Sequence, residues 1–234
     1  MTWSILVRDS ATGALGAAVA SRFFAVGALC IHVEGGVAAL ATQALVNPMY
    51  AVHAMPRLRD GTSATDVLAA LVNQDPGRAQ RQFHILDAQG RIAQHTGDGC
   101  VTWAGHVHGT DISVAGNMLA GPEVVARTLD AFVAATGTMA ERLMTAMEAG
   151  EAAGGDKRGR QGAGLKICSA DPYPDLDIRA DDHPDPLGEL RRLYRVSLER
   201  YAVFRRHLAG TERPFGVWDR KAIDAAIARE GIAP

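Results

Sequence analysis

The chain has 234 residues, 47% of them hydrophobic, and a formal net charge of −2 at pH 7. This composition supports a sizeable buried core and argues against nucleic acid or an anionic membrane surface as a partner. No apolar run approaches the roughly 18 residues that a membrane span requires, and we expect no signal peptide before the first strand, hence a cytoplasmic globular protein.

Apolar stretches separated by turn residues predict hairpins in the first half of the chain. Asn47-Pro48 supplies an N-cap and a first-turn proline for a helix reaching Asp60, and Ser63 caps a helix over Ala64–Asn73. The predicted strands are Thr2–Asp9, Gly13–Ser21, Leu29–Val33, Val37–Gln43, Gln82–Asp87, Arg91–Thr96, Val101–Val107 and Ile112–Ala115.

The second half of the chain is mainly helical. After Gly121-Pro122, apolar residues at helical spacing predict helices over Glu123–Ala135 and Met139–Ala149. Gly154–Gly164 is expected to be a glycine-rich loop. The remaining elements are a predicted strand, a long charged helix and a shorter helix, over Leu165–Cys168, Leu187–Leu208 and near Asp219–Glu230.

The order of these elements predicts an α+β fold. Short turns imply antiparallel strands, and helices that arrive in pairs suit the two outer faces of stacked sheets. A four-layer αββα sandwich, with two antiparallel sheets between helix layers, therefore fits better than a doubly wound parallel sheet. We divide the chain into an αββα domain over residues 1–180 and a C-terminal helical extension over residues 181–234, which packs on the domain or on a partner subunit.

Met1-Thr2, at the head of the first predicted strand, is the feature most informative about function. Removal of Met1 would leave a threonine that carries both a hydroxyl nucleophile and a free α-amine as its base. The reference pKa of an α-amine is about 7.7–8.0, so part of it is unprotonated at neutral pH. Many cytosolic proteins also begin with Met-Thr without any catalytic role, so the dipeptide needs support from the rest of the chain.

Three further positions at predicted strand ends carry polar groups suited to a site. Gly116-Asn117 could aim an amide at a developing oxyanion, although Asn117 is equally suited to a turn with positive φ. Ser21-Arg22 ends the second strand, and Arg22 could hold a substrate carboxylate as a fork or could be a plain surface arginine. Gln43 lies in an apolar strand and must find partners in protein or substrate.

The loop Gly154–Gln161 concentrates charges beside adjacent glycines. Asp156 could orient an amine, and Arg158 and Gln161 could contact an anionic substrate. The alternative is an Asp156–Arg158 pair that pins a turn and supports its neighbours. The spacing of a phosphate-binding Walker loop is absent, which argues against nucleotide binding.

We expect no metal and no cofactor. His106 and His108 share one face of a strand but lack a third ligand nearby in sequence, so we interpret them as solvated strand histidines. The acidic segment Asp181–Asp185 precedes a helix, where capping is the simpler role. The cysteines, odd in number and widely spaced in strand-like segments, are expected to be buried reduced thiols: Cys30, Cys100 and Cys168.

Several segments occur in an order that resembles a known family. The chain resembles the DUF1028 family, which is grouped with the N-terminal-nucleophile (Ntn) hydrolases that share a fold with proteasome β-subunits. The likeness covers roughly residues 1–200; it implies the αββα fold, and hydrolysis only through the superfamily. Gly162 departs from the small serine expected after Gln161. The segments are Thr2-Trp3-Ser4-Ile5, Ala18-Val19-Ala20-Ser21-Arg22, Ala41-Thr42-Gln43-Ala44, Gly116-Asn117 and, most specific, Ala153-Gly154-Gly155-Asp156-Lys157-Arg158-Gly159-Arg160-Gln161.

The leading hypothesis is therefore an Ntn-type amidohydrolase in which Thr2 forms an acyl-enzyme from a small amide or related C–N bond. Arg22, Arg158 and Asp156 would select a small polar, carboxylated substrate. One alternative is a non-catalytic protein that binds a small ligand on the same fold. Another is an assembly protein whose C-terminal helices form a subunit interface; in each case we expect a homo-oligomer.

Overall fold

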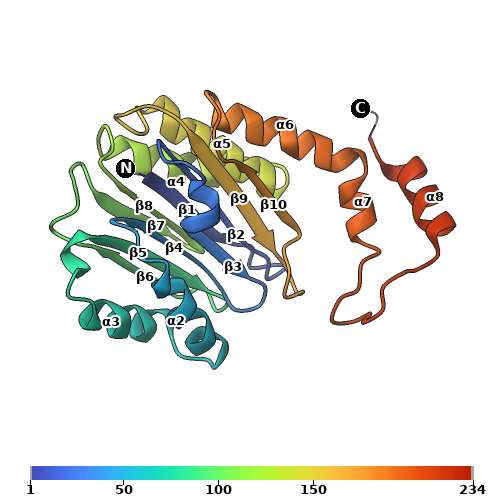
Figure 1. Cartoon of the computed structure of the whole chain (residues 1–234), viewed down its shortest axis with the longest axis horizontal. Coiled ribbons are helices and arrows are strands. Elements are labelled where there is room, and N and C mark those ends of the chain that lie inside the picture. Colours follow the sequence, from blue (N-terminus) through green and yellow to red (C-terminus); the bar gives the residue numbers. More distant parts are fainter. Residues whose placement is uncertain (1, 233–234) are drawn as a thin grey trace.

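A computed structural model of the chain describes residues 2–232. Its strands form two antiparallel sheets that lie face to face, with helices on both outer faces (Figure 1). The strands are β1 (Thr2–Arg8), β2 (Leu15–Ser21), β3 (Ile31–Glu34), β4 (Ala38–Ala44), β5 (Arg81–Asp87), β6 (Ile92–Thr96), β7 (Gly105–Gly109), β8 (Ile112–Asn117), β9 (Gly162–Cys168) and β10 (Leu176–Ala180). The helices are α1 (Val26–Leu29), α2 (Met49–Arg59), α3 (Ala64–Gln74), α4 (Glu123–Ala134), α5 (Met139–Ala152), α6 (Pro186–Glu199), α7 (Tyr201–Arg205) and α8 (Arg220–Glu230), with a 3-10 turn at Arg78–Gln80.

The larger sheet has the order β10-β9-β2-β1-β8-β7 and the smaller one the order β3-β4-β5-β6. Helices α4 and α5 pack on the outer face of the larger sheet, and α2 and α3 cover the smaller sheet. The predicted four-layer αββα sandwich is therefore confirmed. Strand β1 lies in the middle of the larger sheet, between β2 and β8, so that one of its faces points toward the smaller sheet.

Alternation along β1 assigns its side chains to two different cores. Trp3 and Ile5 point outward and pack with residues of α4 and α5, whereas Leu6 belongs to the cluster between the sheets. Thr2 and Ser4 lie on the same face as Leu6, because successive side chains of a strand point to opposite faces. All of these side chains are buried.

Capping chemistry sets the helix starts much as predicted. The Ser63 hydroxyl accepts a hydrogen bond from Asp66 N at 3.1 Å, and Thr138 forms a complete capping box with Glu141 at the start of α5. Asn47 Oδ1 accepts from Met49 N at 3.1 Å, but Pro48 occupies the N-cap position and the helix begins at Met49, so the predicted cap and first-turn proline each lie one position too early.

Glycines account for one difference from the prediction. The segment expected to be a loop up to Gly164 is already strand from Gly162 onward, paired with β2. A Cβ on Gly164 would lie 2.6 Å from Gly27 Cα, so the glycine is what lets α1 pack against β9. Glycines taken as loop signals therefore mark a close backbone approach.

Other boundaries also differ from the prediction. Strand β10 and the short helix α1 were not anticipated, and β7 begins at Gly105 rather than Val101. Of the cysteines, Cys168 lies in a strand, whereas Cys30 follows α1 and Cys100 lies in a turn. All three are free and buried, as predicted.

The predicted long C-terminal helix is broken. It divides at Arg200, whose φ of −139° and ψ of −47° are not helical, into α6 and α7. Helix α6 packs on the larger sheet through Leu187 and Leu190, whereas α7 and α8 lie beyond the sandwich (Figure 1). In the connection between α7 and α8, the side chains of Phe215 and Trp218 are 90% and 89% exposed.

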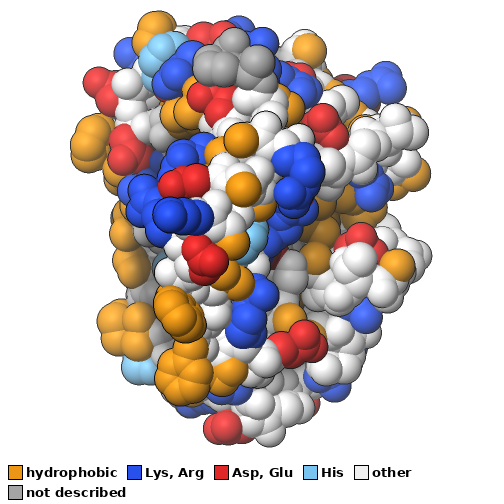
Figure 2. All heavy atoms as spheres, turned by 90° about the vertical axis from the view of Figure 1, so that its right-hand side faces the viewer, with side chains coloured by type: hydrophobic (Ala, Val, Ile, Leu, Met, Phe, Trp, Pro, Cys, Tyr) orange, Lys and Arg blue, Asp and Glu red, His pale blue; other side chains and the backbone are white. Residues whose placement is uncertain are grey.

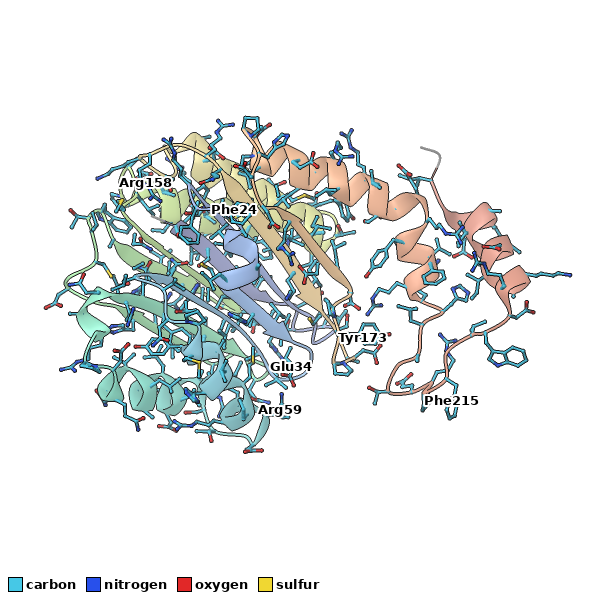
Figure 3. The ribbon with its side chains drawn as sticks, in the orientation of Figure 1. Phe24, Glu34, Arg59, Arg158, Tyr173 and Phe215 are labelled. Atoms are coloured by element: carbon cyan, nitrogen blue, oxygen red, sulfur yellow. The ribbon has the colours of Figure 1, made fainter. Side chains whose placement is uncertain are left out.

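On the side of the molecule that lies to the right in Figure 1, basic, acidic and apolar side chains are interspersed (Figure 2). Arg158 lies near the start of β1, and Phe215 lies at the far end on the C-terminal connection (Figure 3). Within residues 2–232, no helix has the length and apolar character needed to cross a bilayer. The division of the chain at residue 180 stays a prediction.

Candidate active site

The layer between the two sheets has a polar half and an apolar half. The polar half, in which buried polar side chains from both sheets meet, extends from the N-terminal end of β1 along β8 to Ser113. It comprises Thr2, Ser4, Ser21, Gln43, Gln82, His84, Ser113 and Asn117. The apolar half comprises Leu6, Leu15, Ala17, Val19, Val26, Cys30, Ile31, Ala39, Ala41 and Leu86.

Thr2 opens β1 and lies within the polar half. Its hydroxyl donates a hydrogen bond to Ser21 Oγ at 3.1 Å. Its carbonyl oxygen accepts from Gln43 Nε2 at 3.4 Å and from Asn117 Nδ2 at 3.3 Å. The structure thus brings four of the predicted site residues together. The predicted removal of Met1 concerns a residue outside the described part of the chain.

Gln82 joins these groups and was missed by the sequence analysis. Its Oε1 accepts from Gln43 Nε2 at 2.7 Å and from Asn117 Nδ2 at 3.1 Å. Its Nε2 donates to Thr96 Oγ1 at 2.8 Å and to the carbonyl of Gly116 at 2.9 Å. The available signal was an amide on the same buried strand face as Leu86.

His84 is the second residue of the polar half that the sequence analysis missed. It is fully buried, with Nε2 2.9 Å from Ser4 Oγ and Nδ1 2.7 Å from Ser113 Oγ. Desolvation, with a smaller contribution from His106, lowers the pKa of His84 to about 3. The imidazole is therefore neutral at physiological pH.

Asp156 anchors the glycine-rich loop beside the end of β2. Its Oδ2 accepts from Arg22 N at 2.8 Å, and its Oδ1 accepts from Arg158 N at the same distance. The Arg158 guanidinium also forms an ion pair with it at 3.1 Å. These are the contacts of the pinned-turn alternative. Asp156 makes no hydrogen bond to Thr2 within residues 2–232, and its catalytic role stays a prediction.

A surface hollow of about 400 Å³ lies next to this loop. Arg22 and Gln161 lie on its wall, whereas Thr2, Gln43 and Arg158 do not. Arg22 Nη1 donates to the carbonyl of Arg158, and Gln161 Nε2 donates to Asp182 Oδ1 at 3.3 Å. The full lining is Arg22, Arg160, Gln161, Asp182, His183 and Pro184.

Backbone conformations rare for residues with a side chain also cluster here. Ala44 (φ 70°) follows Gln43 on β4, Met118 (φ 58°) follows Asn117, and Ala25 (φ 52°) lies shortly after Arg22. The positive φ thus lies at Met118 and not at Asn117, which is the last residue of β8, so the turn alternative for Asn117 was wrong. Such strain persists where the surrounding structure enforces it, often at functional sites.

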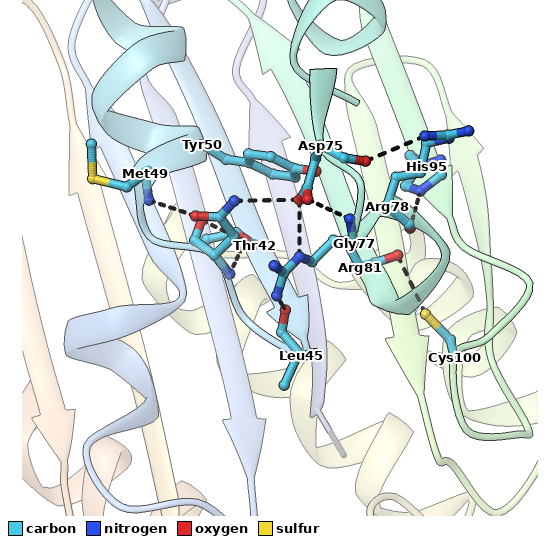
Figure 4. A network of polar contacts seen from close by, with 11 residues as sticks. Thr42, Leu45, Met49, Tyr50, Asp75, Gly77, Arg78, Arg81, His95 and Cys100 are labelled. Atoms are coloured by element: carbon cyan, nitrogen blue, oxygen red, sulfur yellow. Dashed lines mark hydrogen bonds and ion pairs between the residues drawn. The ribbon is translucent and has the colours of Figure 1, made fainter. Parts of the chain in front are cut away.

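A separate polar cluster around Asp75 joins the segment after β4 to the start of β5 (Figure 4). The Asp75 carboxylate accepts a hydrogen bond from Tyr50 Oη at 2.8 Å and forms an ion pair with Arg81 at 3.0 Å. Desolvation would raise the pKa of Asp75, but these hydrogen bonds and one from Gly77 N outweigh it and bring the pKa to about 2. Arg81 is the first residue of β5 and precedes Gln82. The charged cluster therefore fixes the start of this strand from outside the polar half.

Nothing in the described part of the chain groups three potential metal ligands. His106 is exposed and its Nδ1 lies 2.9 Å from Thr96 Oγ1, and His108 lies on the same exposed face of β7. Asp185 accepts from Gly188 N at 3.4 Å and caps α6, in line with the capping interpretation.

Comparison with known proteins identifies the family. The model of the family described as "Family of unknown function (DUF1028)" matches residues 2–190, and the chain belongs to this family. A crystal structure of protein SPO2555 from Silicibacter pomeroyi, also assigned to DUF1028, is 31% identical with a TM-score of 0.87. The match covers 94% of this chain and 96% of that one.

More distant structures match with low scores. Anbu, an ancestral β-subunit from Yersinia bercovieri, is 14% identical with a TM-score of 0.39, over 84% of this chain and 94% of that chain. Eukaryotic HslV from Trypanosoma brucei is 12% identical with a TM-score of 0.38, over 70% and 98%. A search of proteins with curated functions finds no match.

Proposed function

We propose that this DUF1028 protein is an Ntn-type amidohydrolase whose nucleophile is Thr2 after removal of Met1. The observation that carries the proposal is the setting of Thr2. It is the first residue of a central strand, buried between two sheets, with its hydroxyl on Ser21 and its carbonyl on two side-chain amides. A residue held on both sides in this way is preorganised for attack.

The α-amine of Thr2 is the base that this environment favours. Among residues 2–232, no lysine, histidine or carboxylate is hydrogen-bonded to the Thr2 hydroxyl, whose side-chain partner is Ser21. In the proposed reaction, Oγ1 attacks the amide carbon while the amine takes the hydroxyl proton and passes it to the leaving nitrogen. Water then attacks the acyl ester, and its proton returns by way of the amine to the threonine oxygen.

The surroundings favour a small substrate with a carboxylate. Arg22 and Gln161 line the hollow next to the end of β2, and Ser21, which bonds the Thr2 hydroxyl, is the residue before Arg22. A guanidinium can bind a carboxylate through two parallel hydrogen bonds. Asp156 holds the backbone of Arg22 and Arg158 beside the hollow. In this proposal Asn117, whose amide contacts the Thr2 carbonyl, contributes to stabilising the oxyanion.

Intact mass spectrometry of the untagged protein, with and without an electrophilic probe for N-terminal threonine, tests the proposal. We expect loss of Met1 and one probe adduct per chain, mapped to Thr2. Thr2→Ala should abolish the adduct and Thr2→Ser should retain it, because serine keeps both hydroxyl and amine. A processed wild-type protein that remains unlabelled would contradict the proposal.

A second function is favoured by a different observation. Thr2 is only 6% exposed and does not line the hollow that contains Arg22. A protein that binds a small anion in this hollow, without using Thr2, would have the same features. Saturable binding of small dicarboxylates to both wild type and Thr2→Ala, lost in Arg22→Ala and without any Thr2 adduct, would favour this function.

A further inference from the structure

The buried polar side chains of the polar half form a continuous chain of hydrogen bonds that ends on residue 2. It starts at Gln94 on β6, a partly buried residue outside the polar half, and runs through Ser113, His84 and Ser4 to Gln43, whose amide reaches the carbonyl oxygen of Thr2. Each link but the last joins side chains of two different strands, and the last joins the Gln43 side chain to a backbone carbonyl oxygen. The question is which atom donates at each link.

Backbone carbonyl groups settle one end of the chain, because they can only accept. Gln43 Nε2 lies 3.2 Å from the carbonyl oxygen of Ala115 and 3.4 Å from that of Thr2. The amide nitrogen must therefore face these carbonyl groups. Gln43 Oε1 consequently faces Ser4 Oγ at 2.8 Å, and Ser4 must donate its single proton to it.

This assignment propagates through the imidazole. Since the Ser4 proton is committed, Ser4 Oγ must accept from His84 Nε2 at 2.9 Å, so Nε2 carries the hydrogen. A neutral imidazole has one N–H, which leaves Nδ1 as an acceptor for the Ser113 hydroxyl at 2.7 Å. Ser113 Oγ in turn accepts from Gln94 Nε2 at 3.0 Å. The opposite tautomer would take the Ser4 proton and leave Gln43 Oε1 buried without a donor.

We propose that this one-directional chain makes Ser4 and His84 positioning residues for Thr2, with His84 held as the neutral Nε2–H tautomer. Its effect on reactivity rests on the proposed function, whereas the direction of the hydrogen bonds does not. The apolar half shows that the space between these two sheets can be filled by apolar side chains alone, so the polar side chains are not needed for packing. The low pKa of His84 agrees with a neutral imidazole.

The tautomer is measurable in the wild-type protein without any assay of activity. Nitrogen-15 NMR of the imidazole should show His84 protonated at Nε2, unprotonated at Nδ1 and unchanged from pH 8 to pH 5. The exposed His106 and His108 provide an internal comparison within the same spectra. A proton on Nδ1, or rapid exchange between the two tautomers, would overturn the assigned direction.

Matched substitutions on one face of β1 test the positioning role. Ser4→Ala removes the donor to Gln43, and Ser4→Thr restores a hydroxyl. Leu6→Ala removes apolar volume beside Ser113 but takes no donor or acceptor from the chain of hydrogen bonds. Loss of one hydrogen bond of ordinary strength corresponds to a change of about tenfold. We therefore expect probe labelling of the folded protein to slow about tenfold in Ser4→Ala, and to recover in Ser4→Thr.

The control and the carbon-13 shift of the Thr2 carbonyl separate the outcomes. Leu6→Ala should lower the melting temperature but keep the wild-type labelling rate and carbonyl shift, whereas Ser4→Ala should move the shift. Equal labelling rates and shifts in Ser4→Ala and wild type would overturn the positioning role. If the wild-type protein is not labelled at all, the proposed function fails. The His84 tautomer and the Thr2 carbonyl shift then still test whether the hydrogen bonds run in the assigned direction and reach Thr2.

Discussion

The two halves of the layer between the sheets are built from the same strands but hold the sheets together differently. On β1 the same face carries Leu6 in the apolar half and Thr2 and Ser4 in the polar half. On β5 it carries Leu86 in the apolar half and Gln82 and His84 in the polar half. The boundary between the halves does not follow one level across the sheets, because Ser4 pairs with Val19, Leu6 with Ser113 and His84 with Ala41.

The two halves differ in what they contribute: the apolar half contributes mainly stability, and the polar half mainly fixed orientations of side chains. Full burial of one leucine side chain contributes about 1.5–3 kcal/mol and needs no particular orientation. A hydrogen bond contributes about 0.5–1.5 kcal/mol net and requires its partner in one place. The polar half thus adds less stability than an apolar core of its size, but it fixes orientations. We infer that it is maintained for the residue it positions, Thr2.

The largest expected effect on stability is in the apolar half. Leu86 is fully buried, so Leu86→Ala removes buried methyl groups and leaves a cavity. We expect the free energy of unfolding to fall by about 2–5 kcal/mol, measured by urea denaturation. A loss below about 1 kcal/mol would show that the apolar half is not the stabilising part of this layer.

The support of the polar half at the glycine-rich loop gives the next effect. Asp156→Ala leaves the backbone N–H groups of Arg22 and Arg158 without their acceptor. We expect a loss of about 1–3 kcal/mol in thermal or chemical unfolding and faster hydrogen exchange in the loop. Asp156→Asn, which retains one acceptor oxygen, should lose less. Unchanged stability together with abolished labelling would instead assign Asp156 to the chemistry.

The buried imidazole makes the stability of the polar half depend on pH. The pKa of His84 is about 3 in the folded protein, against about 6.5 in the unfolded chain. Between these values the unfolded state binds more protons. The free energy of unfolding contributed by His84 is therefore full above pH 6.5 and falls on acidification by up to about 1.4 kcal/mol per pH unit.

Titration of urea stability from pH 7 to pH 4, in wild type and in His84→Gln, isolates this contribution. The difference between the two curves should grow steadily in favour of the variant as the pH falls. A constant difference would mean that His84 has an ordinary pKa. It would remove the evidence that the imidazole is held in its neutral form.

The smallest expected effect is the inertness toward alkylation of two buried thiols, Cys30 in the apolar half and Cys168 at the end of β9. Desolvation raises the pKa of the Cys30 thiol to about 12 and that of Cys168 to about 11. In the native protein at pH 8, iodoacetamide should therefore leave both thiols unmodified, and in urea it should modify them. Rapid modification of Cys30 in the native protein would show that the apolar half opens readily.

The fold followed from the sequence because its signals are local. Apolar strands joined by short turns, the cap at Ser63 and helices that arrive in pairs were sufficient to predict the αββα order. The errors came from residues whose role depends on distant neighbours. Gly164 looked like a loop residue until α1 was found packed against it, and the break at Arg200 has no glycine or proline at that position to mark it.

The site was predicted in part for the same reason. Polar residues at strand ends, such as Ser21, Gln43 and Asn117, stood out because they border turns or motifs. Gln82 and His84 lie within a strand, and only the packing of β5 across from β1 and β8 shows that they face the larger sheet rather than α2 and α3. A polar residue on an otherwise apolar face was the signal that could have identified them.

The most direct test of the difference between the halves compares two variants of β5. For Gln82→Leu and Leu86→Ala we measure the rate of probe labelling at Thr2 and divide it by the folded fraction, which urea denaturation determines. Gln82→Leu should label about ten to a hundred times more slowly, since two amides lose their common acceptor, and Leu86→Ala should label at the wild-type rate. Equal rates in the two variants would contradict the account, because the polar half would then be no more than part of the core.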